Sequence, residues 1–168
     1  DAVTCVFVDA QQNLWAGTSD GITLFKGDEI HYYKEKNGFL NNNINCITSD
    51  HAGNIWIGTD AGVACFNGTT FTYYSKKEGL GSNRVTAILA DANNLIWIGT
   101  LGGGITNFDG NVFHTYTTLD GRSNNVIWSL QTDSENKLWA STEKGLTVFT
   151  KNSKNDVDFN QFDIQSYF

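Results

Sequence analysis

The chain has 168 residues, of which 13% are aromatic, with 17 glycines and neither proline nor methionine. Its length is that of a single domain, and no apolar run approaches the roughly 18 residues that a membrane-spanning helix needs. The formal net charge of −7 argues against nucleic acid and anionic membrane surfaces as partners, because phosphate groups are bound by clustered lysine and arginine.

The first predicted element is a strand at Val3–Val8. The residues before it lack the charged and apolar regions of a secretory signal peptide, and the sequence has no initiator methionine. We therefore expect a piece excised or processed from a longer protein, with a targeting signal that lies upstream.

One pattern recurs four times along the chain, at intervals of 41, 41 and 42 residues. Each copy has an aspartate six places before a tryptophan, a threonine three places after it and a glycine six places after it. A period of about 40–45 residues with four short strands per unit is typical of a β-propeller blade. The tryptophans are Trp15, Trp56, Trp97 and Trp139, the aspartates Asp9, Asp50, Asp91 and Asp133, the threonines Thr18, Thr59, Thr100 and Thr142, and the glycines Gly21, Gly62, Gly103 and Gly145.

The second repeat illustrates the four strands expected in each blade. Its stretch Ile55-Trp56-Ile57-Gly58-Thr59 is apolar on both faces, because alternate residues of a strand point to opposite sides. A strand of this kind has to be covered on both faces, and neighbouring blades supply that cover. Asn67-Gly68 is a strong hairpin signal. The expected strands are residues 44–49, 55–59, 63–66 and 71–74.

Two sets of small residues recur at fixed places in the repeat. The position two after each tryptophan is expected to leave room for side chains of the next blade. A second small position, in each first strand, is interpreted as a crowded place near the propeller axis. The first set is Gly17, Gly58, Gly99 and Ser141, and the second is Cys5, Cys46, Ala87 and Ser129.

These residues resemble the two-component regulator propeller repeat. The pattern is Asp-x-x-Gly-Asn-φ-Trp-Ile-Gly-Thr-x-x-Gly-φ-x-x-Phe, with φ apolar, followed by Phe-x-x-Tyr and Gly-Leu-x-x-Asn-x-Val. The last segment is clearest at residues 79–85 and looser at 38–44 and 121–127. The resemblance covers about residues 1–150, and the Gly-His and Trp-Asp pairs of WD40 repeats are absent. There are three departures: the expected turn glycine is present only as Gly53, Gly104 is an extra residue, and Arg122 replaces the leucine seen at Leu80.

The whole chain is therefore predicted to be all-β, with four four-stranded antiparallel blades at about residues 1–36, 37–77, 78–119 and 120–168. Residues 164–168 are expected to form the last strand, after a polar insertion at 151–161. The resemblance implies rings that are commonly seven-bladed. The chain is then either a small ring or a fragment of a larger one, whose open faces would favour self-association or a longer propeller chain.

The three cysteines are expected to be free, buried thiols rather than disulfide partners. Cys5 and Cys46 occupy equivalent places in successive blades, whereas Cys65 lies in a third strand. Two strands apart within a sheet is roughly 9–10 Å, which exceeds the usual Cα separation in a disulfide.

No cluster of residues in the sequence indicates catalysis, a metal or a cofactor. The histidines His31, His51 and His114 are scattered without metal-ligand spacing. The four repeated aspartates precede turns, where side-chain bonds to turn amides explain them better than acid–base chemistry. The glycines at 102–104 are interpreted as a turn, since no helix follows them to form a phosphate site.

The residues that break the repeat at one end of the blades are the candidates for ligand binding. By the resemblance, ligands bind at the face that we call the mouth. It is made by the loops that join successive blades and by the loops between second and third strands. Aligning the first strands places a small polar residue in three repeats and an indole in the fourth. The aligned residues are Thr4, Asn45, Thr86 and Trp128.

Trp128 is the candidate stacking platform for a sugar, because an indole combines apolar area with a polar handle. The alternative is that it fills a wedge between blades. Arg84, Asn45 and Arg122 are candidate polar contacts, flanked by the asparagines at 41–43. The alternative is that these are solvent-exposed polar loop residues that do not bind a ligand.

By the resemblance, the chain is expected to be a ligand-sensing propeller module from the extracytoplasmic part of a two-component-type sensor. Its ligand would be a small molecule, with an oligosaccharide favoured, and its location periplasmic or extracellular. One alternative is a protein-binding scaffold propeller of a surface or secretion-linked protein. A weaker alternative is a propeller lyase, since streptogramin lyase-like propellers have similar short aromatic repeats.

Overall fold

The computed structural model describes residues 2–117, 125–151 and 157–162. The described chain is all-β apart from one 3₁₀ turn. The strands are β1 (Val3–Val8), β2 (Leu14–Thr18), β3 (Gly21–Lys26), β4 (Glu29–Tyr33), β5 (Ile44–Ser49), β6 (Ile55–Thr59), β7 (Gly62–Phe66), β8 (Phe71–Tyr74), β9 (Val85–Ala90), β10 (Ile96–Thr100), β11 (Ile105–Phe108), β12 (Phe113–Tyr116), β13 (Ile127–Thr132), β14 (Leu138–Thr142), β15 (Gly145–Lys151) and β16 (Val157–Phe162), with the 3₁₀ turn η1 at Glu35–Asn37.

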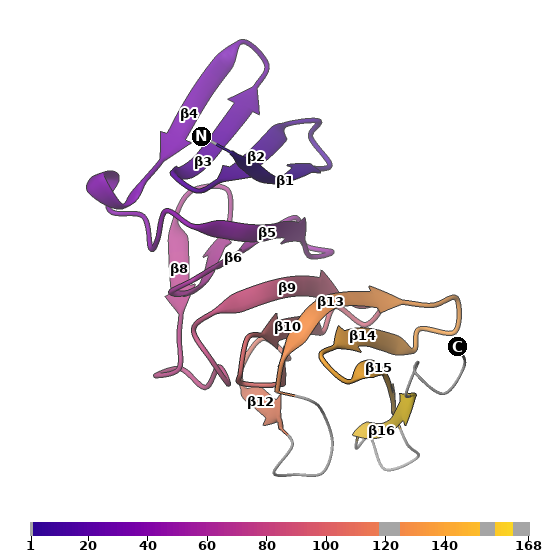
Figure 1. The fold of residues 1–168 in the computed structure, drawn as a ribbon. Coiled ribbons are helices and arrows are strands. Elements are labelled where there is room, and N and C mark those ends of the chain that lie inside the picture. Colours follow the sequence, from indigo (N-terminus) through magenta and orange to yellow (C-terminus); the bar gives the residue numbers. More distant parts are fainter. Residues whose placement is uncertain (1, 118–124, 152–156, 163–168) are drawn as a thin grey trace.

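The strands form four antiparallel sheets of four, each in chain order. We call them blades 1 to 4. The first strands of successive blades pack side by side, β1 on β5, β5 on β9 and β9 on β13. Figure 1 shows that the blades follow an open arc, with β1 far from β13. The predicted blade fold is confirmed, and the chain is a segment of a propeller rather than a closed four-bladed ring.

One face of blade 1 is left uncovered by this arc. Val6 and Val8 of β1, Phe25 of β3, and Ile30 and Tyr32 of β4 are all exposed. Alternation along the strands places them on the face opposite Trp15. The corresponding face of blade 2 is packed against blade 1. The open face is therefore an unpartnered propeller face.

The core lies between successive blades, in three separate clusters. Trp15, Trp56 and Trp97 are no more than 4% exposed, whereas Trp139, in the last blade, is half-buried. The expected burial of the repeat tryptophans is thus confirmed, except for Trp139, whose blade has no following blade to cover it in the described chain. The three buried tryptophans each pack against apolar residues of the next blade.

The repeated aspartates bind turn amides, as predicted, and they also accept a bond from the tryptophan six residues later. In blade 2, Asp50 Oδ1 accepts from the amides of Ala52 and Asn54, both at 2.9 Å. Its Oδ2 accepts from Trp56 Nε1 at 3.0 Å. The same indole–carboxylate bond recurs in the other three blades at 2.9–3.1 Å. The bond explains the constant spacing of six.

The glycine two after the tryptophan leaves room for the next blade, as the sequence predicts. A Cβ placed on Gly58 would lie 2.5 Å from Cys46 Sγ and 2.6 Å from Val85 Cγ1. Val85 belongs to blade 3, so the glycine sets the distance between blades. Gly17 and Gly99 face Ile44 and Ile127 of their next blades in the same way.

We predict that Gly58→Ala lowers the free energy of unfolding by about 1–3 kcal/mol, because the added methyl overpacks the interface. Urea unfolding measures the loss. Cys46→Ala in the same chain should restore part of it, since it removes one of the two crowding atoms. An undiminished cost in the double variant would show that Cys46 is not the obstacle.

The prediction for the last strand is wrong. The fourth strand of blade 4 is β16, and its register with β15 joins Lys151 to Val157 and Phe149 to Phe159. The hairpin therefore closes within residues 151–161, the predicted insertion. The reason is that β15 extends to Lys151 and is still paired with β16 there. Residues 164–168 lie outside the described residues.

Cys5, Cys46 and Cys65 are free thiols. Burial raises the pKa of Cys46 to about 12 and that of Cys65 to about 11, so both remain protonated at neutral pH. They are packing residues between blades rather than nucleophiles.

Candidate ligand-binding mouth

A β-bulge at the start of each blade creates the position that the sequence singles out. In blade 1, Val3 pairs with Thr18 and Cys5 with Gly17, which leaves Thr4 outside the ladder. The same shift leaves out Asn45 in β5, Thr86 in β9 and Trp128 in β13. A bulge re-aims the side chain of its extra residue. The alignment of these four residues is thus explained.

In three blades the bulge residue ties its blade to the next one. Thr4 Oγ1 donates to Ile44 O at 2.5 Å, and Thr86 Oγ1 donates to Ile127 O at 2.6 Å. Asn45 Nδ2 donates to Val85 O at 2.8 Å. These bonds explain why the position is small and polar. Trp128 holds the place in blade 4, with 55% of its surface exposed.

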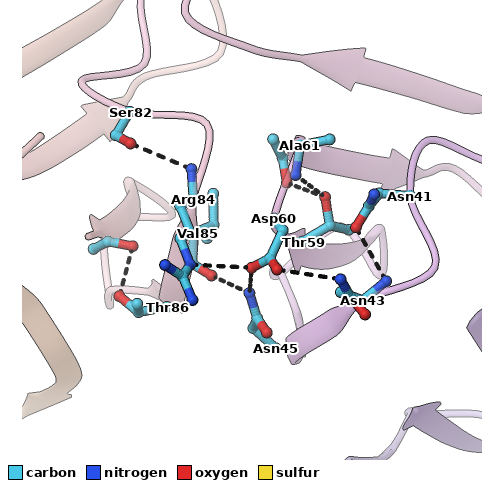
Figure 2. A network of polar contacts seen from close by, with 12 residues as sticks. Asn41, Asn43, Asn45, Thr59, Asp60, Ala61, Ser82, Arg84, Val85 and Thr86 are labelled. Atoms are coloured by element: carbon cyan, nitrogen blue, oxygen red, sulfur yellow. Dashed lines mark hydrogen bonds and ion pairs between the residues drawn. The ribbon is translucent and has the colours of Figure 1, made fainter. Parts of the chain in front are cut away.

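Asp60 organises the mouth between blades 2 and 3. Its carboxylate accepts from Asn45 Nδ2 at 3.0 Å and from Asn43 Nδ2 at 3.3 Å. Arg84 Nε lies 3.5 Å from Asp60 Oδ1. Figure 2 shows Asp60 at the centre, between Arg84 and Asn43, with Asn45 below it. The structure therefore brings Arg84 and Asn45 together through a carboxylate.

Arg84 is exposed, with 61% of its side chain accessible. Because Nε is held by Asp60, the terminal guanidinium nitrogens are directed away from that pair. Both hydrogens of Asn45 Nδ2 are used, one by Asp60 and one by Val85 O. Arg84 thus has donors to offer a ligand, whereas Asn45 offers its amide oxygen.

Sequence reasoning missed Asp60. It follows Thr59 at the first residue of the β6–β7 turn, where the other repeats have Ser19, Leu101 and Glu143. This variation at one turn position was the available signal. The asparagines at 41 and 42 bind Glu35 instead, through Asn41 Nδ2 at 2.8 Å and the Asn42 amide at 3.1 Å. They shape the loop before β5.

Arg122 lies outside the described residues. The residues at its place in the repeat, Phe39 and Leu80, are buried between blades. Within the described chain, no three histidine, cysteine or acidic side chains are grouped as ligands for a metal. No helix in the described part has the length and hydropathy to cross a membrane.

The blades, the buried indole–carboxylate pairs and the inter-blade bonds define a β-propeller segment built from one repeat. The family model for the two-component regulator propeller matches residues 38–61, 79–102 and 121–144. These three stretches therefore match the two-component regulator propeller repeat, as the sequence pattern predicts. No curated protein sequence matches the chain.

Solved structures share the fold at low sequence identity. The extracellular domain of a one-component system from B. thetaiotaomicron superposes with a TM-score of 0.77 at 19% identity, over 92% of this chain and 24% of that one. A second structure of the extracellular domain of the same protein, there described as a hybrid two-component system, gives 0.70 at 21% identity, over 94% and 21%. A catalytically inactive virginiamycin B lyase from Staphylococcus aureus gives 0.70 at 16% identity, over 95% and 55%. The chain thus spans about a quarter of the length of the chains in the two extracellular-domain structures.

Proposed function

We propose that this chain is a ligand-sensing propeller segment from the extracytoplasmic part of a two-component-type sensor, and that its ligand is a neutral oligosaccharide. The observation that carries the proposal is the repeat itself, which belongs to the two-component regulator propeller. Structures of similar fold are described as the extracellular domain of a one-component or hybrid two-component system, which supports a location outside the cytoplasm.

The mouth supplies the chemistry for an oligosaccharide. Trp128 offers an exposed apolar ring with a polar N–H, and such a ring stacks on the apolar face of a sugar. Arg84 and the amide oxygen of Asn45 lie at the same end of the neighbouring blades and bind hydroxyl groups. Arg122 completes the proposed set.

We predict that Trp128→Thr weakens binding to neutral oligosaccharides on a glycan array by about ten- to hundredfold, because stacking on an indole contributes about 1–3 kcal/mol. Threonine is the residue that blades 1 and 3 have at this position, so the change suits the fold. The matched control is Tyr32→Thr, which removes an aromatic residue that is 56% exposed on blade 1.

Urea unfolding should be the same for the wild type and Trp128→Thr. Binding that survives the substitution would remove Trp128 from the site, and a wild-type chain that binds no glycan would overturn the oligosaccharide proposal. A lower unfolding free energy with binding retained would identify Trp128 as a wedge between blades.

A further inference from the structure

A groove of about 920 Å³ lies between blades 1 and 2. It reaches the loop that joins these blades, but Asn45, Arg84 and Trp128 of the mouth do not line it. Its lining includes Trp15, Leu24, Ile55 and Phe66. The first three are no more than 5% exposed and form an apolar floor. A volume of this order suits a small molecule.

The groove is open at one end because a glycine replaces an asparagine. Between blades 2 and 3, Asn94 Oδ1 accepts from the amide of His51 at 2.8 Å. Between blades 3 and 4, Asn136 Oδ1 accepts from the amide of Ala92 at 3.2 Å. These bonds close the corresponding ends of the other two interfaces. In blade 2 the equivalent residue is Gly53, which lines the groove and has no side chain to cross it.

The other end is lined by two aromatic residues, Phe39 and Tyr73, where the next interface has Leu80 and Thr115. Tyr73 Oη donates to Gly38 O at 3.3 Å, and Thr115 Oγ1 makes the equivalent bond to Gly79 O at 3.0 Å. Phe39, in the place of Leu80, packs edge-to-face on Phe71 at 5.1 Å. Aromatic rings thus line this end of the groove.

Lys26 is the charged group of the groove that is left for a ligand. It is exposed, and no ion pair joins it to a carboxylate among the described residues. Blades 2 and 3 have Asn67 and Asp109 at its place. Asp9, at the floor, is held by donors that include Trp15 Nε1 at 2.9 Å.

Two other titratable side chains share the face of blade 1 that carries Lys26. Glu29 lies opposite it in the β3–β4 hairpin, and its carboxylate is 3.2 Å from His31 Nε2. His31 also lines the groove. Because Glu29 is turned toward His31, the ammonium group of Lys26 is the cation that remains to meet a negatively charged ligand.

We propose that this groove binds a small organic acid, with an apolar, mostly aromatic body on the floor made by Trp15, Leu24, Ile55 and Phe66 and a carboxylate on Lys26. An aliphatic and aromatic floor favours an apolar body over the hydroxyl-rich ring of a sugar. Four residues that differ from their counterparts in blade 3 meet here: Gly53, Phe39, Tyr73 and Lys26. None of the residues proposed to bind the oligosaccharide lines the groove, and the proposal does not depend on the oligosaccharide proposal.

The experiment titrates the 168-residue chain with phenylacetate, indole-3-acetate and octanoate, and with the matched neutral amides, by calorimetry. We expect at least one acid to bind, and its amide to bind about tenfold more weakly, because the bond to the charged Lys26 is lost. In Lys26→Gln, each acid and its matched amide should bind with equal affinity. Failure of every acid to bind, or equal binding of acids and amides to the wild type, would overturn the proposal.

A second variant closes the groove without removing a core residue. Gly53→Asn places an asparagine where blades 3 and 4 have one, at a positive φ of 85° with no atom within 4 Å of the added Cβ. Asn94 and Asn136 adopt φ values of 59° and 58° at the same turn position. We expect acid binding to weaken by about tenfold or more, with an unfolding free energy no lower than that of the wild type.

Tyr73→Thr introduces the residue found at Thr115 and should weaken the same binding from the other end of the groove. Trp128→Thr serves as the control, because it changes the mouth and leaves the groove intact. Acid binding that is unchanged by both Gly53→Asn and Tyr73→Thr would refute the assignment to this groove. Loss of glycan binding in Trp128→Thr with acid binding retained would show that the two sites are separate.

Discussion

Trp56→Ala is expected to lower the free energy of unfolding by about 3–5 kcal/mol, the usual range for a large buried aromatic side chain. Trp56 is 4% exposed. Its ring stacks on Tyr74 at 5.9 Å and lies 5.9 Å from Phe108 of blade 3. Removing it leaves a cavity between two blades and deprives Asp50 of a donor.

Urea unfolding of the chain measures this loss, with Trp128→Ala as the control. Trp128 is 55% exposed, so its removal should change stability by no more than about 0.5 kcal/mol. A loss below about 1 kcal/mol for Trp56→Ala would contradict its role in the interface. Equal losses in the two variants would contradict it as well.

The repeat made most of the fold predictable. A tryptophan that recurs with an aspartate before it and a threonine after it fixes the turns and the second strand of each blade, and the flanking apolar runs supply the other strands. The expected strand at residues 71–74 matches β8. Where the repeat weakens, near Lys151, the prediction was wrong. Pairing across a hairpin depends on the register of β15, which the sequence pattern there does not specify.

The sequence predicted which residues share the position at the mouth, but not which of the residues there contact one another. Alignment placed Thr4 and Trp128 together without revealing that both are bulge residues. It did not reveal that Asp60 contacts both Arg84 and Asn45, because that contact depends on the packing angle between successive blades. The groove was missed for a related reason. The significance of Gly53 depends on what Asn94 and Asn136 reach in the blades before them.

Asp50→Asn tests the other half of the tryptophan pair. Whichever way the new amide is turned, its NH₂ group faces two donors that the carboxylate accepted: either the amides of Ala52 and Asn54, or Asn54 Nδ2 and Trp56 Nε1. An unsatisfied buried group costs about 1–3 kcal/mol. We expect a loss of that size at pH 7. Asp133→Asn in blade 4, where the same bonds are exposed, should cost less.

The loss in Asp50→Asn should depend on pH. Burial by itself would raise the pKa of Asp50, but bonds from Trp56, Asn54 and Ala52 outweigh it and hold the pKa below its usual value. A carboxylate with a depressed pKa in the folded state stabilises the protein fully above its unfolded pKa of about 4, and this stabilisation is lost as the pH falls through the folded pKa. Asparagine does not titrate. The gap between the wild type and Asp50→Asn in urea unfolding should therefore be largest at pH 7 and shrink below about pH 4. A gap that stays constant down to pH 3 would show that the substitution acts through packing, and that the negative charge on Asp50 does not hold the indole in place.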